Sequence, residues 1–225
     1  MKWWKYLAIV LLLYTAVMGF LGPVPRLAIL NETERNLYFH VPMWFGMTII
    51  LGTSVYFSIQ YLRAPSPRLD ILASESAKTG ILLGALGLMT GSLWARYTWG
   101  TWWTSDVKLN GAAVAMLIYF AYLVLRGAVQ DEQQRARLAA IYNVFAFAVA
   151  IPLLFIMPRL YASLHPGMGG NPGFSKYDLD SHMRLVFYPA VIGWTLLAVW
   201  VTEVSCRFAF VKEKIYEKHL DKQAA

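Results

Sequence analysis

Long apolar stretches alternate with short polar connections along most of the chain. An α-helix needs about 20 mostly apolar residues to cross the hydrocarbon core of a bilayer. The stretches that approach this length are Tyr6–Leu21, Leu37–Leu62, Ala77–Trp94, Gly111–Leu125, Leu138–Leu160 and Leu185–Phe210. The first and the fourth are short, so we expect flanking residues to extend them. The pattern predicts an all-α fold, an integral membrane bundle of six transmembrane helices.

The composition also indicates that lipid is the main solvent of this chain. Hydrophobic residues make up 58% of the 225 residues and charged residues only 15%, whereas a soluble domain carries roughly 25% charged residues. Because little sequence remains outside the six stretches, we predict a single membrane domain over residues 1–225. The first stretch follows Lys2 and Lys5, as in a signal peptide, but no small-residue cleavage motif follows it. We expect it to be retained as the first helix.

Lysine and arginine are distributed unevenly between alternate connections. They are more frequent at the amino end, in the second-to-third and fourth-to-fifth connections, and in the carboxy-terminal tail. The positive-inside rule then predicts that both termini are cytoplasmic. The outer connections lie near residues 22–40, 95–108 and 161–182. The net charge of +7 is mostly a topology signal on this interpretation, and its spread over loops and tail argues against a nucleic-acid interface.

Three of the four histidines lie in the outer connections, namely His40, His165 and His182. His40 precedes Pro42, which suits the first turn of a helix, and such a histidine can simply bond a carbonyl at the membrane interface. Histidine is also the commonest metal ligand. Neutral imidazoles of His40 and His165, supplied by different loops, could hold a haem iron from opposite sides. His182 is an alternative ligand, although it is placed to begin the last helix.

The second outer connection contains the segment TWGTWWTSD, with Trp99, Trp102 and Trp103 around Gly100 and ahead of Asp106. One interpretation is an aromatic belt, in which tryptophans lie at the level of the lipid headgroups. The other is a stacking surface for a flat, apolar macrocycle. If the segment is helical, the three indoles share one face. Asp106 could cap the fourth helix or contact the ligand directly.

Several other side chains leave alternatives open. Methionines near the histidines could also bind iron, although methionine more often fills gaps, and these are Met43, Met47 and Met168. Cations beside the outer connections could pair with haem propionates or anchor helix ends, and these are Arg96, Lys108, Arg159 and Arg184. A small-molecule transporter or channel without haem would need polar groups throughout the helix interiors, where Lys78 and Glu203 are the main candidates.

The motifs WGTWW before Asp106, FHVP at His40 and LHP at His165, in a chain of six helices, resemble the haem-handling CcmC proteins of cytochrome c maturation. The resemblance extends over essentially the whole chain. It implies that haem b is bound non-covalently, as cargo, at the outer face of the bacterial inner membrane. It further implies that His40 and His165 are the axial ligands of the iron. The haem-contacting loop would consist of Trp99, Gly100, Trp102, Trp103 and Asp106.

The same resemblance implies partners and excludes a chemical role. Proteins of this kind pass haem to a membrane-anchored haem chaperone and work beside ABC transporter subunits and a small single-span membrane protein. Larger relatives that complete haem attachment have more helices and further histidines within the membrane, which this chain lacks, so we expect delivery and no enzymatic activity. One departure is Ser105, because the related proteins usually have a tryptophan immediately before the aspartate.

Overall fold

The computed structural model describes residues 2–26, 30–165 and 179–224. In chain order its elements are α1 (Trp3–Leu21), the 3₁₀ helix η1 (Asn31–Asn36), α2 (Leu37–Arg63), α3 (Pro67–Trp99), α4 (Val107–Ala128), α5 (Glu132–Ile151), the π-helical turn η2 (Pro152–Ile156), α6 (Met157–Leu160) and α7 (Ser181–Ala224). The described part of the chain contains no strand, so the predicted all-α class is confirmed.

The prediction of six membrane-spanning helices is also confirmed, since six helical spans are long and apolar enough to cross a bilayer. One of them, Glu132–Leu160, combines α5, η2 and α6. Several helices extend past the apolar stretches of the sequence. For example, α3 begins at Pro67 and α7 continues to Ala224. Side chains cap the amino ends of two helices, as is usual for serine and aspartate. The Ser66 hydroxyl caps α3 and the Asp131 carboxylate caps α5.

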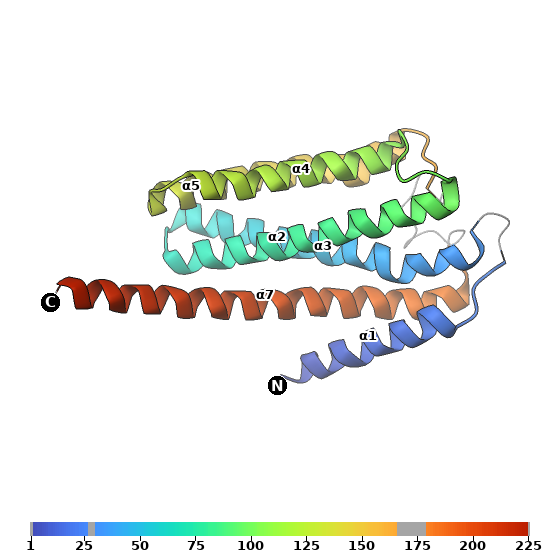
Figure 1. Ribbon diagram of the computed structural model, residues 1–225, viewed down its shortest axis with the longest axis horizontal. Coiled ribbons are helices and arrows are strands. Elements are labelled where there is room, and N and C mark those ends of the chain that lie inside the picture. Colours follow the sequence, from blue (N-terminus) through green and yellow to red (C-terminus); the bar gives the residue numbers. More distant parts are fainter. Residues whose placement is uncertain (1, 27–29, 166–178, 225) are drawn as a thin grey trace.

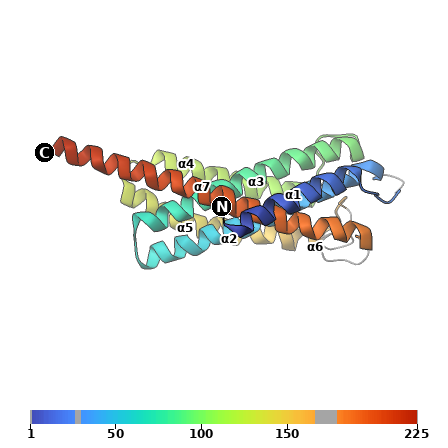
Figure 2. The same cartoon turned by 90° about the horizontal axis from the view of Figure 1, so that it is seen from below.

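Helix α2 lies within the bundle, where it packs against α3, α5 and α7, while α1 packs mainly against α7 and α4 against α5. The start of α2, the α3–α4 connection, the end of α6 and the start of α7 lie at one end of the bundle, and the α2–α3 and α4–α5 turns lie at the other (Figure 1). The same separation is seen in the perpendicular view (Figure 2). Following the predicted orientation, we call them the outer end and the inner end.

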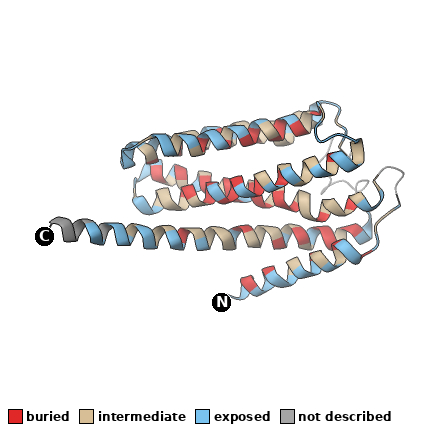
Figure 3. Ribbon diagram, in the orientation of Figure 1, coloured by how far each residue is buried: buried red, intermediate tan, exposed pale blue. Residues whose placement is uncertain are grey.

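Glycines of α3 allow α2 and α4 to approach closely. A Cβ atom at Gly80 would lie 2.5 Å from Leu51 of α2, and one at Gly84 would lie 2.3 Å from Met116 of α4. Small residues at such crossings are typical of helix packing in membranes. Buried residues accordingly concentrate where these helices meet, and the outer faces of the bundle are mostly exposed (Figure 3).

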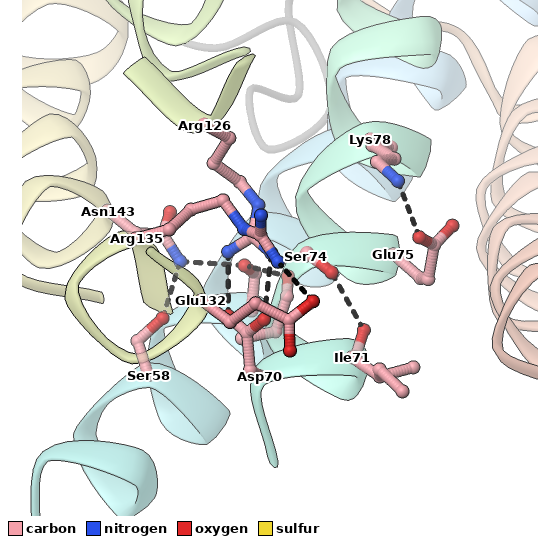
Figure 4. A network of polar contacts seen from close by, with 12 residues as sticks. Ser58, Asp70, Ile71, Ser74, Glu75, Lys78, Arg126, Glu132, Arg135 and Asn143 are labelled. Carbon is pink, nitrogen blue, oxygen red and sulfur yellow. Dashed lines mark hydrogen bonds and ion pairs between the residues drawn. The ribbon is translucent and has the colours of Figure 1, made fainter. Parts of the chain in front are cut away.

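A network of polar side chains crosses between the helices near the inner end (Figure 4). The Asn143 amide of α5 donates to the Ser54 hydroxyl at 2.7 Å and to the Ser58 hydroxyl at 2.9 Å, both on α2. Nearby, the guanidinium of Arg126 forms two hydrogen bonds, of 2.6 and 2.8 Å, with the carboxylate of Asp70. These contacts tie α2 to α5 and α3 to α4. Sequence analysis did not predict them.

Candidate functional site

A cavity lies at the outer end between η1, α2, α3, α4 and the η2–α6 segment, and we call it the outer cavity. Its empty volume is about 1400 Å³, which includes the part that is open to the outside. Most of its lining is apolar, and its polar and aromatic members are Glu34, Asn36, His40, Trp44, Phe45, Thr48, Ser92, Trp94, Trp103, Lys108, Phe155, Arg159 and His165. A large apolar cavity with a few convergent polar groups is the usual form of a small-molecule site.

His40 is the fourth residue of α2, and its ring lies against α3. Its Nδ1 atom is 3.0 Å from the hydroxyl of Thr90. That hydroxyl already donates its hydrogen to backbone carbonyls of its own helix, at 2.9 Å to Leu86 and 3.1 Å to Gly87. It therefore accepts the hydrogen of Nδ1. Nε2 of the neutral imidazole then has a lone pair that no described residue uses. Nε2 is one of the two atoms through which a histidine binds a metal.

His165 has the same hydrogen-bonding arrangement with a different partner. Its Nδ1 atom is 3.1 Å from Oδ1 of Asp106, and an ionised carboxylate can only accept, so Nδ1 carries the hydrogen. The Nε2 atom then has a lone pair and no hydrogen-bond partner among the described residues. Burial and the positive charge of Lys108 lower the pKa of His165 to about 4, against the opposing effect of Asp106. The imidazole is therefore neutral at physiological pH, as a metal ligand must be.

Asp106 joins the start of α4 to the segment that carries His165. Its Oδ1 atom accepts from the backbone N–H of Lys108 at 2.9 Å and of Leu109 at 3.3 Å, which confirms the predicted helix cap. Its Oδ2 atom accepts from the Leu164 N–H at 2.7 Å and from the Ser163 hydroxyl at 2.8 Å. Burial by itself would raise the pKa of Asp106, but these hydrogen bonds outweigh it and the pKa is lowered. The group is thus a buried anion that orients His165.

The tryptophans of the second outer connection have different environments. Trp99 lies edge-on to His165, with 5.2 Å between ring centroids, whereas Trp103 lines the outer cavity and donates from Nε1 to Asn110. Trp102 is 56% exposed and belongs to a shallow groove on the outside of α3. Of these three indoles, therefore, only that of Trp103 lines the outer cavity.

Trp99, Trp102 and Trp103 do not share one helical face, because the segment that contains them is not helical throughout. Helix α3 ends at Trp99, and Gly100 follows in the left-handed conformation, with φ of 76°. A residue of this kind ends a helix, and residues 100–106 are not helical. Pro42 also lies deeper than predicted, inside α2, because η1 and the first turn of α2 precede it.

Several members of the site were not identified from the sequence. Trp94 lies beside His165, with 6.1 Å between ring centroids, and lines the cavity. Thr90 and Ser163 were missed because their roles depend on which helix faces meet. Glu34 is buried in the cavity wall, and within the described residues its Oε2 atom has no hydrogen-bond partner. A glutamate in the polar segment NETERN gives no sign of this in the sequence.

Other candidates lie outside the cavity. Met43 and Met47 are buried in the core between helices and do not line it, and Met168 lies outside the described residues. His182 is exposed in the first turn of α7, and the Asp180 carboxylate caps that helix by accepting from the Met183 N–H. Ser105 is exposed and does not line the cavity. The structure thus leaves His40 and His165 as the histidines of the outer cavity.

Comparison with known proteins gives the family. A family model described as "CcmC: Heme exporter protein C" matches residues 1–223. The chain belongs to this family. The CcmC match agrees with the resemblance carried by the tryptophan-rich segment and the two histidine motifs.

Individual relatives in the CcmC family have low sequence identity to this chain, but the matches cover most of both chains. A protein named "Heme exporter protein C" from Bradyrhizobium diazoefficiens is 28% identical over 191 residues, which cover 82% of this chain and 70% of the relative. A protein of the same name from Escherichia coli is 24% identical over 208 residues, or 91% of this chain and 81% of the relative. A ccmC-like mitochondrial protein of cytochrome c biosynthesis from Marchantia polymorpha is 27% identical over 157 residues, 69% and 64% of the two chains.

The residues of the outer cavity suit a haem. Its iron needs one or two strong axial ligands, which histidine Nε2 atoms supply, and its ring needs apolar walls. Its propionates need cations, and both Lys108 and Arg159 line the same cavity. Within the described residues no three His, Cys, Asp or Glu side chains form a cluster that could hold a bare metal ion.

Proposed function

We propose that this protein binds haem b non-covalently in the outer cavity and delivers it, as cargo, during maturation of c-type cytochromes. The observation that carries the proposal is that His40 and His165 line one cavity from different segments, with Nδ1 of each ring held by Thr90 or Asp106. Membership of the CcmC family and the names of the relatives, which specify heme export and cytochrome c biosynthesis, support it.

In this proposal each wall of the cavity has a separate task. His40, fixed by Thr90, ligates iron from the α2–α3 side, and His165, fixed by Asp106, ligates it from the α6 side. Trp103 and Trp94 cover the faces or edges of the porphyrin, where flat aromatic rings contribute dispersion and exclude water. Lys108 and Arg159 neutralise propionates. The protein itself makes and breaks no covalent bond of the haem, and its task is to bind, orient and release.

We further propose that the site lies on the periplasmic side of the bacterial inner membrane. The basic inner connections support this orientation. From there a membrane-anchored haem chaperone would accept the cargo, and ABC transporter subunits and a small single-span membrane protein would form the surrounding assembly. The exposed Trp102 and the open mouth of the cavity leave room for an acceptor to approach.

The test is to purify the protein from haem-replete cells and to measure haem content and visible spectrum for His40→Ala, His165→Ala and the double variant. Both ligands contribute, so each single variant should lose most of its haem, and millimolar imidazole should restore the spectrum by replacing the missing ring. His182→Ala is the matched control because it removes an outer histidine that does not line the cavity. Full haem loading of the double variant would refute the ligand assignment.

A further inference from the structure

The inner end of α7 extends further than any other helix in both perpendicular views (Figures 1 and 2). The helix has 44 residues, which at about 1.5 Å per residue gives a length of roughly 65 Å, whereas the hydrocarbon core of a bilayer is about 30 Å thick. A substantial part of α7 therefore lies outside the lipid. The haem proposal gives this extension no role.

The inner interface can be located on α7 from side chains that favour it. The ammonium of Lys5 lies 5.2 Å from the ring centroids of both Trp4 and Trp200, and it pairs with Glu203 at 2.9 Å. Tryptophan and lysine at one level are typical of the membrane–water boundary. Residues of α7 beyond about position 204 consequently lie among headgroups or in water.

Beyond this level α7 carries an apolar seam that no part of the described chain covers. The seam consists of Val204, Phe208, Val211 and Ile215, which are 37%, 73%, 55% and 52% exposed. Their spacing of four, three and four residues places them on one side of the helix, as the core positions of a coiled coil are. The opposite side faces the bundle, since Cys206 is buried.

The residues that flank the seam are basic. In the heptad defined by Phe208 and Ile215 at position a and Val211 at position d, Arg207 and Lys214 occupy g and Lys212 occupies e. All three are exposed. Arg207 pairs within the helix with Glu203. The positive-inside rule explains basic residues at this level but not their placement on both edges of an apolar seam.

The charge pattern decides what can cover the seam. In a second copy of this chain, parallel pairing would bring g against e and antiparallel pairing would bring g against g and e against e, so that like charges would meet in either case. A lipid surface is disfavoured as well, because α7 continues along its own axis away from the bundle and does not lie across the inner end (Figures 1 and 2). A partner helix with apolar core positions and carboxylates on both flanks satisfies both requirements.

We propose that the seam of α7 docks a cytoplasmic partner protein through an acidic amphipathic helix. The proposal depends on the predicted orientation but not on the haem site. Apolar contacts at Phe208, Val211 and Ile215 supply the buried area, and pairing of Lys212 and Lys214 with carboxylates selects the partner.

A photo-crosslinking amino acid at position 211 of the full-length protein, in cells that make the partner proteins, tests the proposal. Position 216 is the matched control, because Tyr216 is 59% exposed on the same helix but lies off the seam. We expect a protein adduct from position 211 in at least tenfold excess over position 216, with the crosslinked peptide mapping to a helix that has Asp or Glu on both flanks. Lys212→Glu with Lys214→Glu should abolish the adduct, and Lys substitutions at the mapped carboxylates should restore it.

An unchanged thermal unfolding curve in detergent shows that the charge-reversed protein is folded, and this control does not depend on the haem site. Adducts only with a second copy of the chain, or only with lipid, would overturn the proposal. So would equal yields from positions 211 and 216, or an adduct that charge reversal leaves unchanged.

Discussion

The two ends of the bundle both bury polar side chains between helices, but they use them differently. At the inner end the Asn143 amide donates to both Ser54 and Ser58, and Arg126 forms a two-pronged pair with Asp70 (Figure 4). At the outer end the Nδ1 atom of each imidazole contacts a neighbouring helix or loop, and both histidines line a cavity. The polar groups of the inner end hydrogen-bond one another and so stabilise the contacts between helices. The histidines of the outer end lie beside an apolar cavity, which favours binding of a ligand.

This comparison also bears on the alternative of a transporter or channel. Such a protein needs polar side chains that face a path through the helices. The charged groups noted in the sequence are instead paired, Lys78 with Glu75 at 2.6 Å and Glu203 with Lys5 at 2.9 Å. Among the described inner-network residues shown in Figure 4, the Asn143 Oδ1 atom is the exception that lacks a partner. The Tyr119 hydroxyl of α4 and Nε1 of Trp194 in α7 are also buried without a partner among the described residues. These atoms are uncharged and belong to three different helices, so they do not form a charged path.

The largest expected effect is a loss of stability, and it follows from Asp70→Asn at the inner end. This change leaves the mostly buried guanidinium of Arg126 without its anion, and breaking such a pair costs about 3–5 kcal/mol. Thermal unfolding in detergent should show a large loss of stability, while haem that remains bound keeps its spectrum. A changed haem spectrum in the folded fraction would mean that the two ends are not separate in function.

The next largest expected effect is a loss of haem affinity, and it follows from Asp106→Asn at the outer end. An amide cannot accept hydrogen bonds on both sides as the carboxylate does, so His165 loses its orientation, and outer-shell changes of this kind typically cost about 10–100-fold in metal affinity. The measurement is the rate of haem transfer to apomyoglobin. Asp131→Asn is the matched control, because Asp131 caps α5 at the inner end, and it should leave this rate unchanged. Equal rates for both variants would contradict the orienting role of Asp106.

A smaller loss, about tenfold in haem retention, is expected from Thr90→Val, which keeps the size of the side chain but removes the acceptor for His40 Nδ1. Thr90→Ser should retain most of the binding. Thr48→Val is the control within the same cavity, since the Thr48 hydroxyl bonds only to the Trp44 carbonyl among the described contacts. If Thr90→Val and Thr48→Val behave alike in the apomyoglobin assay, the tautomer assigned to His40 is wrong.

The smallest effect, a few-fold increase in haem release, is expected from Gly91→Ala. The added Cβ atom would lie 2.8 Å from Cε1 of His40, which is too close for an ordinary contact, so the ring would have to shift. Gly127→Ala near the inner end meets no atom within 4 Å and should leave release unchanged. Equal release rates from these two variants would show that the position of the His40 ring does not matter.

Sequence reasoning could predict the helices but not the faces by which they meet. Each span is apolar all round, because lipid and protein interior are similar solvents for side chains, so the pattern contains no stripe that marks the buried face. Contacts between helices were therefore missed, including His40 with Thr90 and Asn143 with Ser54. The cap at Asp106 was predictable because it depends on local sequence, whereas its bond to His165 joins segments 59 residues apart.

The same reasoning explains the outcome for the tryptophan-rich segment. Its composition left an aromatic belt and a stacking surface as alternatives, and the family resemblance implied contact with haem. Trp103 does line the outer cavity. The helical face did not form because Gly100 ends α3. Trp102 and Trp103 share the groove on α3, but of the three indoles only that of Trp103 also lines the outer cavity. This arrangement depends on the path of the loop, which residue types alone do not define.

The central claim is that two imidazoles from different segments ligate one iron, and low-temperature electron paramagnetic resonance of the purified ferric protein tests it most directly. The account predicts a low-spin signal characteristic of two histidine ligands in the natural protein, and conversion to a high-spin signal in His40→Ala and in His165→Ala. A high-spin signal in the natural protein, or a low-spin signal that persists in both variants, would contradict it.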